Sequence, residues 1–336
     1  MSNTPLPPGA PEYKADRVAP RPATCPVCGQ IGAPLFTLFD DRYGYPGSHR
    51  LYGCACRHRF LPTGMSPEEI GSLYTRYYPR SSFDIEAWQA PEAASGLLTW
   101  WRGLKASAFR WVPPNVRVLD IGCGFGESLG YHRARGCDAH GVEADRNILR
   151  VAARHGLQVQ AGLFNPDLYA PASFDWVTLD QVIEHLSDPL AVLRGIHRVL
   201  KPGGTLVVST PNANGWGARL FGRRWIHWHA PYHQQFFTPA SMASAATKAG
   251  FELVSSTTVT NTAWLDFQWG HLATWPAQDQ PSPYWSPGRP RTLPQRVALK
   301  LLLLVDRLGA NALLTRLMDG LSLGDNVVYV LRKPAA

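Results

Sequence analysis

The chain has 336 residues, of which 45% are hydrophobic and 17% charged, a composition that excludes fibrous and broadly disordered proteins. Its formal charge of +8 mildly favours an acidic partner, such as a nucleotide-linked or phosphorylated substrate or a membrane surface. Because lysines and arginines are spread along the chain without a dense run, the charge does not indicate nucleic-acid binding. The length allows one large domain and one small one.

The amino-terminal residues and the hydropathy pattern bear on where the protein resides. We expect residues 1–20, which are polar and rich in proline, to form a disordered leader without the apolar core of a signal peptide. No apolar stretch of the sequence reaches the roughly 18 residues of a membrane span. We therefore expect a cytoplasmic protein, in which cysteines stay reduced and disulfides are rare.

Residues 21–64 contain two close pairs of cysteines: Cys25 with Cys28, and Cys54 with Cys56. In a reducing compartment, pairs at this spacing indicate a tetrahedral Zn²⁺ ion held by four thiolates, and we expect a small zinc ribbon. The second pair is C-x-C, tighter than the usual C-x-x-C, and His58 is an alternative fourth ligand. Such a zinc ion would be structural, because four protein ligands leave no position open for catalysis.

A tryptophan-rich segment precedes the main domain. We expect residues 65–114 to form a helical connector, with a helix start at Ser66 where serine, proline and glutamate occupy capping positions. Residues 115–336 form the main domain, in which strands and helices alternate up to the fifth strand; this alternation predicts a parallel sheet with crossover helices. The sequence thus divides into a leader, a ribbon, a connector and one large α/β domain.

The first strand of that domain, Val116 to Ile121, is followed by a loop with three glycines and then a helix. The glycines are spaced one residue apart: Gly122, Gly124 and Gly126. They let the backbone turn sharply and approach a ligand at a helix N-terminus. The spacing departs from the dinucleotide fingerprint, and Asp120 beside the loop would repel a pyrophosphate. S-adenosylmethionine, which is cationic and has no phosphate, fits these residues better.

Acids and amides at the ends of later strands extend this cofactor site. Glu143 follows the second strand and is placed to accept the ribose hydroxyls, as the equivalent acid does in nucleotide folds. Asp180 and Gln181 end the fourth strand, Phe174 to Asp180, and should border the methionine part of the cofactor. The ends of neighbouring parallel strands meet at one edge of a sheet, so these residues should lie close together.

Two later motifs complete a set. Residues 183–189 read Ile-Glu-His-Leu-Ser-Asp-Pro, and residues 199–204 read Val-Leu-Lys-Pro-Gly-Gly ahead of a fifth strand. With the glycine loop, they make residues 115–260 and the last strand resemble the class I S-adenosylmethionine-dependent methyltransferases of the small-molecule branch. The resemblance implies an α/β fold: a Rossmann-like seven-stranded methyltransferase sheet with helices on both faces, here with a zinc ribbon before it and a helical insertion before the last strand.

The chain differs from the family at one position of the cofactor site, and its amino-terminal ribbon has a counterpart in related proteins. The family often carries an acid for the adenine amine after the third strand, but this chain has Gly162-Leu-Phe-Asn165. We expect adenine to be held by backbone and apolar contacts, with Leu163 or Phe164 beside it. A ribbon ahead of such a domain resembles proteins found among bacterial sugar and polysaccharide tailoring enzymes, in which the ribbon is structural.

The best substrate-side candidate is the histidine loop, residues 227–233, which reads His-Trp-His-Ala-Pro-Tyr-His. Its three histidines could bind a metal, but no carboxylate lies nearby in sequence, so metal-free contact with the substrate is the simpler interpretation. His233 resembles the histidine before the FFTP element of related enzymes, and we expect it to act as a general base or as a hydrogen-bond donor. His185 is a weaker catalytic candidate, because the Glu184–His185 pair reads as structural in the family.

An insertion, residues 260–324, separates the last two strands. Its second half, residues 295–321, is expected to be helical with one apolar face: Leu301, Leu304, Leu308, Leu314, Leu317 and Leu321. Packing against the domain is the simplest interpretation of that face. The alternatives are a lid over the substrate, a dimer contact or contact with a membrane surface.

The sequence leaves several functions open. The first is methyl transfer to a small molecule, a sugar or nucleotide-linked metabolite in polysaccharide or secondary-metabolite tailoring. The second is O-methylation of a lipid-like or quinone intermediate, with the leucine-rich insertion facing a membrane. The third is a zinc-ribbon binding protein whose cofactor domain is catalytically silent, and a nicotinamide dehydrogenase is the weakest. The oligomeric state and the methylated atom are not indicated.

Overall fold

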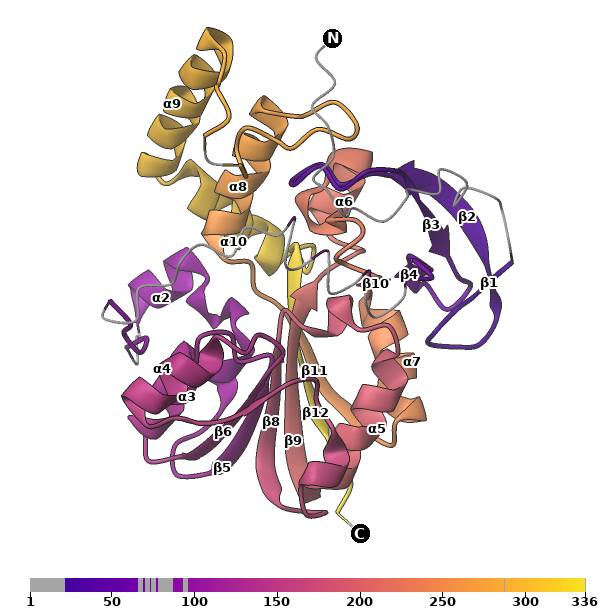
Figure 1. Ribbon diagram of the computed structural model, residues 1–336, viewed down its shortest axis with the longest axis vertical. Coiled ribbons are helices and arrows are strands. Elements are labelled where there is room, and N and C mark those ends of the chain that lie inside the picture. The colour runs from indigo at the N-terminus through magenta and orange to yellow at the C-terminus, as the bar shows by residue number, and fades with distance from the viewer. Residues whose placement is uncertain are drawn as a thin grey trace.

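The computed structural model describes residues 22–65, 69, 73, 77, 87–92, 96–286 and 288–335. The expected leader, residues 1–20, and the expected helix start at Ser66 lie outside the described residues. The described residues form two sheets, one of five strands and one of seven, joined by helices (Figure 1). The larger sheet carries the predicted cofactor motifs, and the turns between strands of the smaller one carry the cysteine pairs.

The seven-stranded sheet has the order β11-β12-β9-β8-β5-β6-β7. Its strands are β5 (Arg117–Ile121), β6 (Asp138–Glu143), β7 (Gln158–Ala161), β8 (Phe174–Asp180), β9 (Leu200–Pro211), β11 (Glu252–Thr258) and β12 (Asn326–Arg332). All neighbours pair in parallel except β12, which is antiparallel to both β9 and β11. The chain leaves β5 toward β6 and later returns beside β5 with β8. The carboxyl end of β5 is therefore the switch point at which α/β sheets bind ligands.

Helices cover both faces of this sheet, as the sequence predicts. On one face, Leu129 of α3 (Glu127–Arg133) and Ile148 of α4 (Ile148–His155) pack with Val118 of β5. On the other face, Leu193 of α5 (Pro189–Val199) and Met242 of α7 (Pro239–Lys248) pack with Leu119 of β5. Burial on both faces explains the continuous apolar runs of the strands. The fold is the predicted Rossmann-like methyltransferase sheet.

Local signals explain where the helices near the site begin. Asp188 accepts a hydrogen bond from the backbone N–H of Ala191, and Pro189 occupies the first helical position of α5. Thr238 and Ser241 form a reciprocal capping box at the start of α7. The Asp-Pro end of the Ile-Glu-His-Leu-Ser-Asp-Pro motif therefore caps a helix. Only the first residues of the motif lie at the carboxyl edge of the sheet.

The smaller sheet has the order β1-β2-β3-β4-β10. Its strands are β1 (Ala23–Thr24), β2 (Ile31–Leu38), β3 (His49–Gly53), β4 (Arg59–Phe60) and β10 (Gln235–Phe236). The last of them comes from the chain just after the histidine loop, and it pairs antiparallel with β4; both are labelled in Figure 1. The amino-terminal ribbon is thus bound to the methyltransferase part by a shared sheet rather than tethered by a linker.

The remaining helices and turns connect these sheets. The described part of the connector contains α2 (Leu97–Arg102) and the 3₁₀ turns η2 (Leu104–Ala106) and η3 (Ala108–Trp111), whereas residues 87–92 form no helix or strand. Short elements elsewhere are η4 (Pro166–Leu168), η5 (Ile183–His185), α6 (Trp216–Leu220), η6 (Gly222–Arg224) and η7 (Ile226–Trp228). The histidine loop, which includes part of η7, lies beside η5 at the carboxyl edge of the large sheet.

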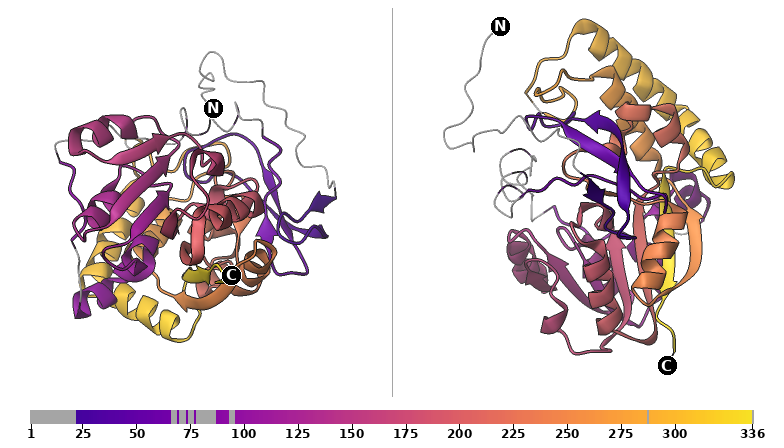
Figure 2. Two further views of the ribbon diagram at one scale, coloured as in Figure 1. Left: turned by 90° about the horizontal axis from the view of Figure 1, so that it is seen from below. Right: turned by 90° about the vertical axis from the view of Figure 1, so that its right-hand side faces the viewer.

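The insertion forms α8 (Thr262–Ala273), α9 (Leu293–Arg307) and α10 (Ala310–Gly320) rather than one leucine-rich helix. Gly309, whose φ is +77°, ends α9 and starts α10. The prediction that the apolar face packs against the domain is wrong: Leu301, Leu304, Leu308, Leu317 and Leu321 are each more than half exposed. No residue of α9 is buried, because this helix lies at the outer end of the molecule, away from the large sheet (Figures 1 and 2).

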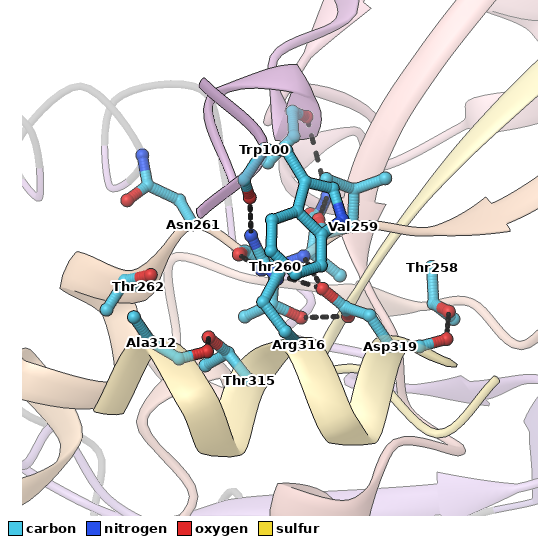
Figure 3. Close-up of polar contacts among 12 residues, drawn as sticks. Trp100, Thr258, Val259, Thr260, Asn261, Thr262, Ala312, Thr315, Arg316 and Asp319 are labelled. Carbon is cyan, nitrogen blue, oxygen red and sulfur yellow. Dashed lines mark hydrogen bonds and ion pairs between the residues drawn. The ribbon is translucent and has the colours of Figure 1, made fainter. Parts of the chain in front are cut away.

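A buried polar cluster fixes the inner helix α10 to the rest of the molecule (Figure 3). The Arg316 guanidinium donates to the backbone carbonyls of Trp100 in α2 and Thr260 after β11, and it pairs with Asp319 at 2.7 Å. Asp319 also accepts from the backbone N–H of Thr260 at 2.9 Å. The inner helix is thus rigidly held, whereas α9 projects beyond it. No helix among the described residues is long and apolar enough to cross a membrane.

Candidate functional site

The glycine loop lies between β5 and α3, and its three glycines have different surroundings. The backbone N–H of Gly122 donates to the Val142 carbonyl at 2.7 Å, which ties the loop to β6. A Cβ at Gly122 would lie 2.4 Å from the Val182 side chain, and one at Gly126 would lie 2.6 Å from Leu157. A Cβ at Gly124, whose φ is +58°, would meet no protein atom within 4 Å. Gly124 is therefore the glycine that a ligand can approach.

Glu143 stands beside that open glycine, as predicted for an acid that binds ribose. Its Oε2 accepts a hydrogen bond from the Gly124 backbone N–H at 3.0 Å, and its Oε1 accepts one from the Asp145 backbone N–H at 2.8 Å. These two bonds fix the carboxylate against the loop. Each carboxylate oxygen has a second lone pair, so the fixed carboxylate can also accept ribose hydroxyls.

Asp120 lies beneath the loop in the interior of the domain. Its Oδ1 accepts from the Thr178 hydroxyl of β8 at 2.6 Å, and its Oδ2 accepts from the Ser128 hydroxyl of α3. Burial raises the pKa of Asp120 to about 6, and the two hydroxyl bonds oppose that rise. Asp120 thus joins two strands and the helix that follows the loop. Its direct contact with a cofactor stays a prediction.

Asp180 and Gln181 occupy the carboxyl end of β8, next to the glycine loop on β5. Burial, with a further contribution from the Asp120 carboxylate, raises the pKa of Asp180 to about 7. Gln181 has a φ of +55°, a left-handed conformation that non-glycine residues adopt mainly where the surrounding structure enforces it. Its side-chain amide donates to Ser209 Oγ at 2.9 Å and to Asn326 Oδ1 at 2.8 Å. Gln181 therefore ties β8 to β9 and β12.

The two residues expected beside adenine differ in exposure. Leu163, which follows β7, is 80% exposed. Phe164 is partly buried, packs against the main core and stacks on Tyr169 with ring centroids 6.2 Å apart. Leu163 is thus accessible to a ligand, whereas Phe164 contributes to the fold. The adenine contacts themselves stay a prediction.

At the same edge, Glu184 and His185 of η5 meet His233 at the end of the histidine loop. One ligand atom from each of the three lies within 4.8 Å of the others. The backbone N–H of Gln234 donates to the Glu184 carbonyl at 2.7 Å and fixes the two segments together. From the sequence we expected no carboxylate near His233. That prediction is wrong, because the fold brings Glu184 of a distant segment next to His233.

Backbone hydrogen bonds define which nitrogen of each histidine carries a proton. His185 Nδ1 lies 3.0 Å from the Tyr232 carbonyl oxygen, and His233 Nδ1 lies 2.8 Å from the His227 carbonyl oxygen. A carbonyl oxygen only accepts, so Nδ1 is the donor in both rings and Nε2 keeps its lone pair. The lone pair of His233 Nε2 can therefore accept a proton or bind a metal ion.

Burial determines the charge state of this cluster. It lowers the pKa of His185 to about 4 and that of His233 well below the usual value, and the nearby Arg42 charge adds to both effects. Burial raises the pKa of Glu184 to about 8; its Oε2 accepts from Thr210 Oγ1 at 3.0 Å, while its Oε1 has no partner among the described residues. Two neutral imidazoles and a carboxyl oxygen can bind a divalent metal ion. Without a metal, the imidazoles are placed as proton acceptors.

The small sheet also contributes to this region, which the sequence did not indicate. The Tyr43 ring lies 5.7 Å from the His229 ring and 5.6 Å from the Tyr232 ring, measured between centroids. The neighbouring Arg42 donates to the Ile226 carbonyl at 2.6 Å. Nothing in the spacing of residues 40–45 signals this contact, because it arises from the pairing of β4 with β10.

The four cysteines of the small sheet form one cluster, as predicted. Cys25 Sγ lies 3.7 Å from Cys56 Sγ, and Cys28 Sγ lies 3.2 Å from Cys54 Sγ. Tetrahedral zinc with Zn–S bonds of about 2.3 Å places sulfurs about 3.8 Å apart, so the donor set fits Zn²⁺. Residues after each pair turn with positive φ: Gly29 at 81° and Arg57 at 67°. The alternative of His58 as a ligand is wrong, because the clustered ligand atoms are the four cysteine sulfurs and do not include a nitrogen of His58, whose Nε2 lies 2.9 Å from Gln235 Oε1.

Comparison with known proteins agrees with this arrangement of strands and motifs. A family model described as a methyltransferase domain matches residues 77–256, which is more than half of the chain. The chain belongs to this family. With its seven-stranded sheet, glycine loop and acid after β6, it is a class I S-adenosylmethionine-dependent methyltransferase.

Individual relatives are similar over part of the chain. A protein named ubiquinone biosynthesis O-methyltransferase from Ralstonia nicotianae (strain ATCC BAA-1114 / GMI1000) is 33% identical over 150 residues, 40% of this chain and 63% of the relative. Its namesake from Xanthomonas campestris pv. campestris (strain B100) is 33% identical over 160 residues, 44% of this chain and 66% of the relative. Each match spans less than two thirds of the relative's length. Among solved structures, the [4+2]-cyclase SpnF aligns with 74% of this chain and 86% of its own, at 21% identity and a TM-score of 0.45.

Proposed function

We propose that the protein transfers a methyl group from S-adenosylmethionine to a hydroxyl oxygen of a phenolic, lipid-like or quinone-type intermediate. The observation that carries this proposal is His233, whose Nδ1 is held by the His227 carbonyl, so that its Nε2 is the proton-accepting nitrogen at the carboxyl edge of the sheet, beside Glu184 and His185. The relatives named as ubiquinone biosynthesis O-methyltransferases favour this acceptor over a sugar or nucleotide-linked one.

The chain's own residues supply binding, orientation and proton removal. Gly124 leaves room for close approach of the donor, and the Glu143 carboxylate held beside it would accept the ribose hydroxyls. S-adenosylmethionine supplies an electrophilic methyl group on a sulfonium that leaves as a neutral thioether. His233 Nε2 accepts the hydroxyl proton as the acceptor oxygen bonds to the methyl carbon and the carbon–sulfur bond breaks. Aligning oxygen, carbon and sulfur while excluding water accounts for most of the acceleration.

The test is methyl transfer from labelled donor to catechols with and without an alkyl tail. We expect product with the wild type and a loss of at least about a hundredfold in kcat for His233→Ala, since a positioned base contributes roughly 10² to 10⁴. His197→Ala is the control, because that histidine lies in α5 and contacts Phe251. If His233→Ala turns over a good acceptor at the wild-type rate, the proposed role of His233 is wrong.

We also propose that the cysteine cluster holds a structural zinc ion. The sulfur separations and the two turns after the cysteine pairs support this assignment. Metal analysis should find one zinc per chain, and Cys28→Ser should lose it together with part of the stability. Cys137→Ser is the control, because Cys137 is buried in a separate core cluster. Zinc-free protein of wild-type stability would contradict the assignment.

The exposed face of α9 supports a lipid-like acceptor. Its leucines are accompanied by exposed basic residues with a single acid among them: Arg296, Lys300, Arg307 and Asp306. An apolar face flanked by cations is the pattern of a helix that lies on an anionic bilayer. We propose that α9 rests on an anionic membrane surface, from which the acceptor reaches the site.

A further inference from the structure

Arg42 sits in a tightly held turn that follows β2. The buried carboxylate of Asp40 accepts hydrogen bonds from the backbone N–H groups of Arg42 at 3.0 Å, Tyr43 at 2.9 Å and Tyr45 at 2.9 Å. Three backbone bonds to one carboxylate fix the turn and the direction in which it presents its side chains. The turn directs the Arg42 side chain into the interior, where the residue is only 5% exposed.

Among the described residues, no carboxylate forms an ion pair with this buried guanidinium. Arg42 Nη2 donates to the Ile226 carbonyl at 2.6 Å, and the guanidinium carbon lies 4.6 Å from the centre of the Trp285 ring. Its Nε has no hydrogen-bond partner among the residues that the structure describes. Burying a charge without an opposite charge is strongly unfavourable, so such a guanidinium is a strong site for an anion.

The guanidinium lies next to the candidate catalytic cluster. Ile226, which receives its hydrogen bond, directly precedes the histidine loop, and Tyr43 contacts the His229 and Tyr232 rings of that loop. Its charge also contributes to the lowered pKa values of His185, His229 and His233. Three segments distant in sequence converge here: the turn after β2, the histidine loop and Trp285 of the insertion.

We propose that Arg42 binds an oxyanion of the acceptor, so that the site selects an aromatic acceptor bearing a carboxylate or an ionised phenol. This inference rests on the proposed function for the location of the acceptor, but not for the existence of the anion site. A planar guanidinium with an unused N–H group can bind a carboxylate or a phenolate through charge-assisted hydrogen bonds.

Binding measurements separate this inference from turnover. The probes are 3,4-dihydroxybenzoate, its neutral methyl ester and 4-nitrocatechol, each titrated into protein saturated with S-adenosylhomocysteine. We expect the wild type to bind the carboxylate about tenfold to a hundredfold more tightly than the ester, as charge-assisted hydrogen bonds imply. Arg42→Met should abolish that preference. Arg42→Gln, which keeps a donor for the Ile226 carbonyl, should abolish it too and guards against misfolding of the first variant.

Arg59→Met is the matched control, because Arg59 also donates to one carbonyl and lies over one tryptophan, Trp228. It should retain the wild-type preference. If the ester binds as tightly as the carboxylate, but 4-nitrocatechol binds as its coloured anion only when Arg42 is present, the bound oxyanion is the phenolate. If neither anion depends on Arg42, the inference is overturned. If binding depends on Arg42 but no catechol is methylated, the proposed function is wrong and the inference about Arg42 stands.

Discussion

The ring of His185 meets the ring of His233 edge to face, with centroids 4.6 Å apart, although the first follows β8 and the second precedes β10. Both rings donate through Nδ1 to carbonyls of the histidine loop, those of Tyr232 and His227. The loop therefore orients the two imidazoles as one unit. A change that displaces one ring therefore also shifts the loop that holds the other ring in place.

This pairing predicts strongly non-additive kinetics. We expect His233→Ala to reduce kcat at least about a hundredfold and His185→Ala severalfold or more. The double variant should be scarcely less active than the less active of the two single variants. Residues that act as a unit lose their function once either is removed. Single-turnover rates for the four proteins of the cycle measure the coupling. Losses that simply multiply would show that the two histidines act separately.

The glycine loop predicts a separation of stability from cofactor binding. Gly124→Ala places a methyl group in open space, so its cost to folding is the left-handed conformation alone, about 1–2 kcal/mol. Its main effect should be weaker binding of S-adenosylhomocysteine, because the methyl group occupies the side that a ligand approaches. Gly122→Ala has the same backbone strain and also meets Val182, so it should lower the melting temperature further. Calorimetry and thermal melts on both variants test this, and a Gly124→Ala protein with unchanged affinity would contradict it.

Much of this loop and of the sheet could be predicted from sequence, because both depend on local pattern. Apolar runs bounded by turn residues predict buried parallel strands, and the predicted strand Phe174 to Asp180 matches β8. The relation of Glu143 to Gly124 was also predictable, since acids and glycines at the ends of adjacent strands meet at one edge. Local chemistry and strand order were sufficient for these features.

The acceptor side of the site could not be predicted, because it depends on contacts between distant segments. Glu184 approaches His233 only because Gln234 bonds to its carbonyl, and Arg42 arrives through the pairing of β4 with β10. The exposure of α9 was missed for a related reason. Leucine periodicity shows that a helix has an apolar face, but it does not show what covers that face.

His132 on α3 gives a pH dependence that is independent of the active site. It is fully buried between aromatic rings, and neither ring nitrogen has a partner among the described residues. Burial lowers its pKa to about 4 from 6.5, so the unfolded chain binds more protons between these two values. The contribution of His132 to the free energy of unfolding is therefore complete above pH 6.5 and is lost as the pH falls toward 4.

Urea unfolding at several pH values within that window measures this effect. The wild type should lose stability as the pH falls, and both His132→Leu and His132→Gln should lose less over the same range. The glutamine variant is the control for polarity, because it keeps a polar group in the core but cannot titrate there. Identical pH slopes in all three proteins would show that His132 is not the group responsible.

The exposed face of α9 predicts binding to anionic lipid. Replacing Leu301 and Leu304, which are 59% and 53% exposed, with glutamate removes apolar area and adds repulsion without disturbing any buried residue. We therefore expect the double variant to fold normally and to lose cosedimentation with vesicles that contain phosphatidylglycerol. Wild-type binding should weaken as salt is raised, because the basic residues of α9 contribute through charge.

Leu168→Glu is the control for this prediction, since Leu168 is 61% exposed but lies in η4, far along the chain from α9. It should bind vesicles as the wild type does. Analytical ultracentrifugation without lipid distinguishes the competing explanation, in which two copies bury this face against each other. A wild-type dimer that Leu301→Glu with Leu304→Glu converts to a monomer, with no vesicle binding by either protein, would replace the membrane contact with self-association.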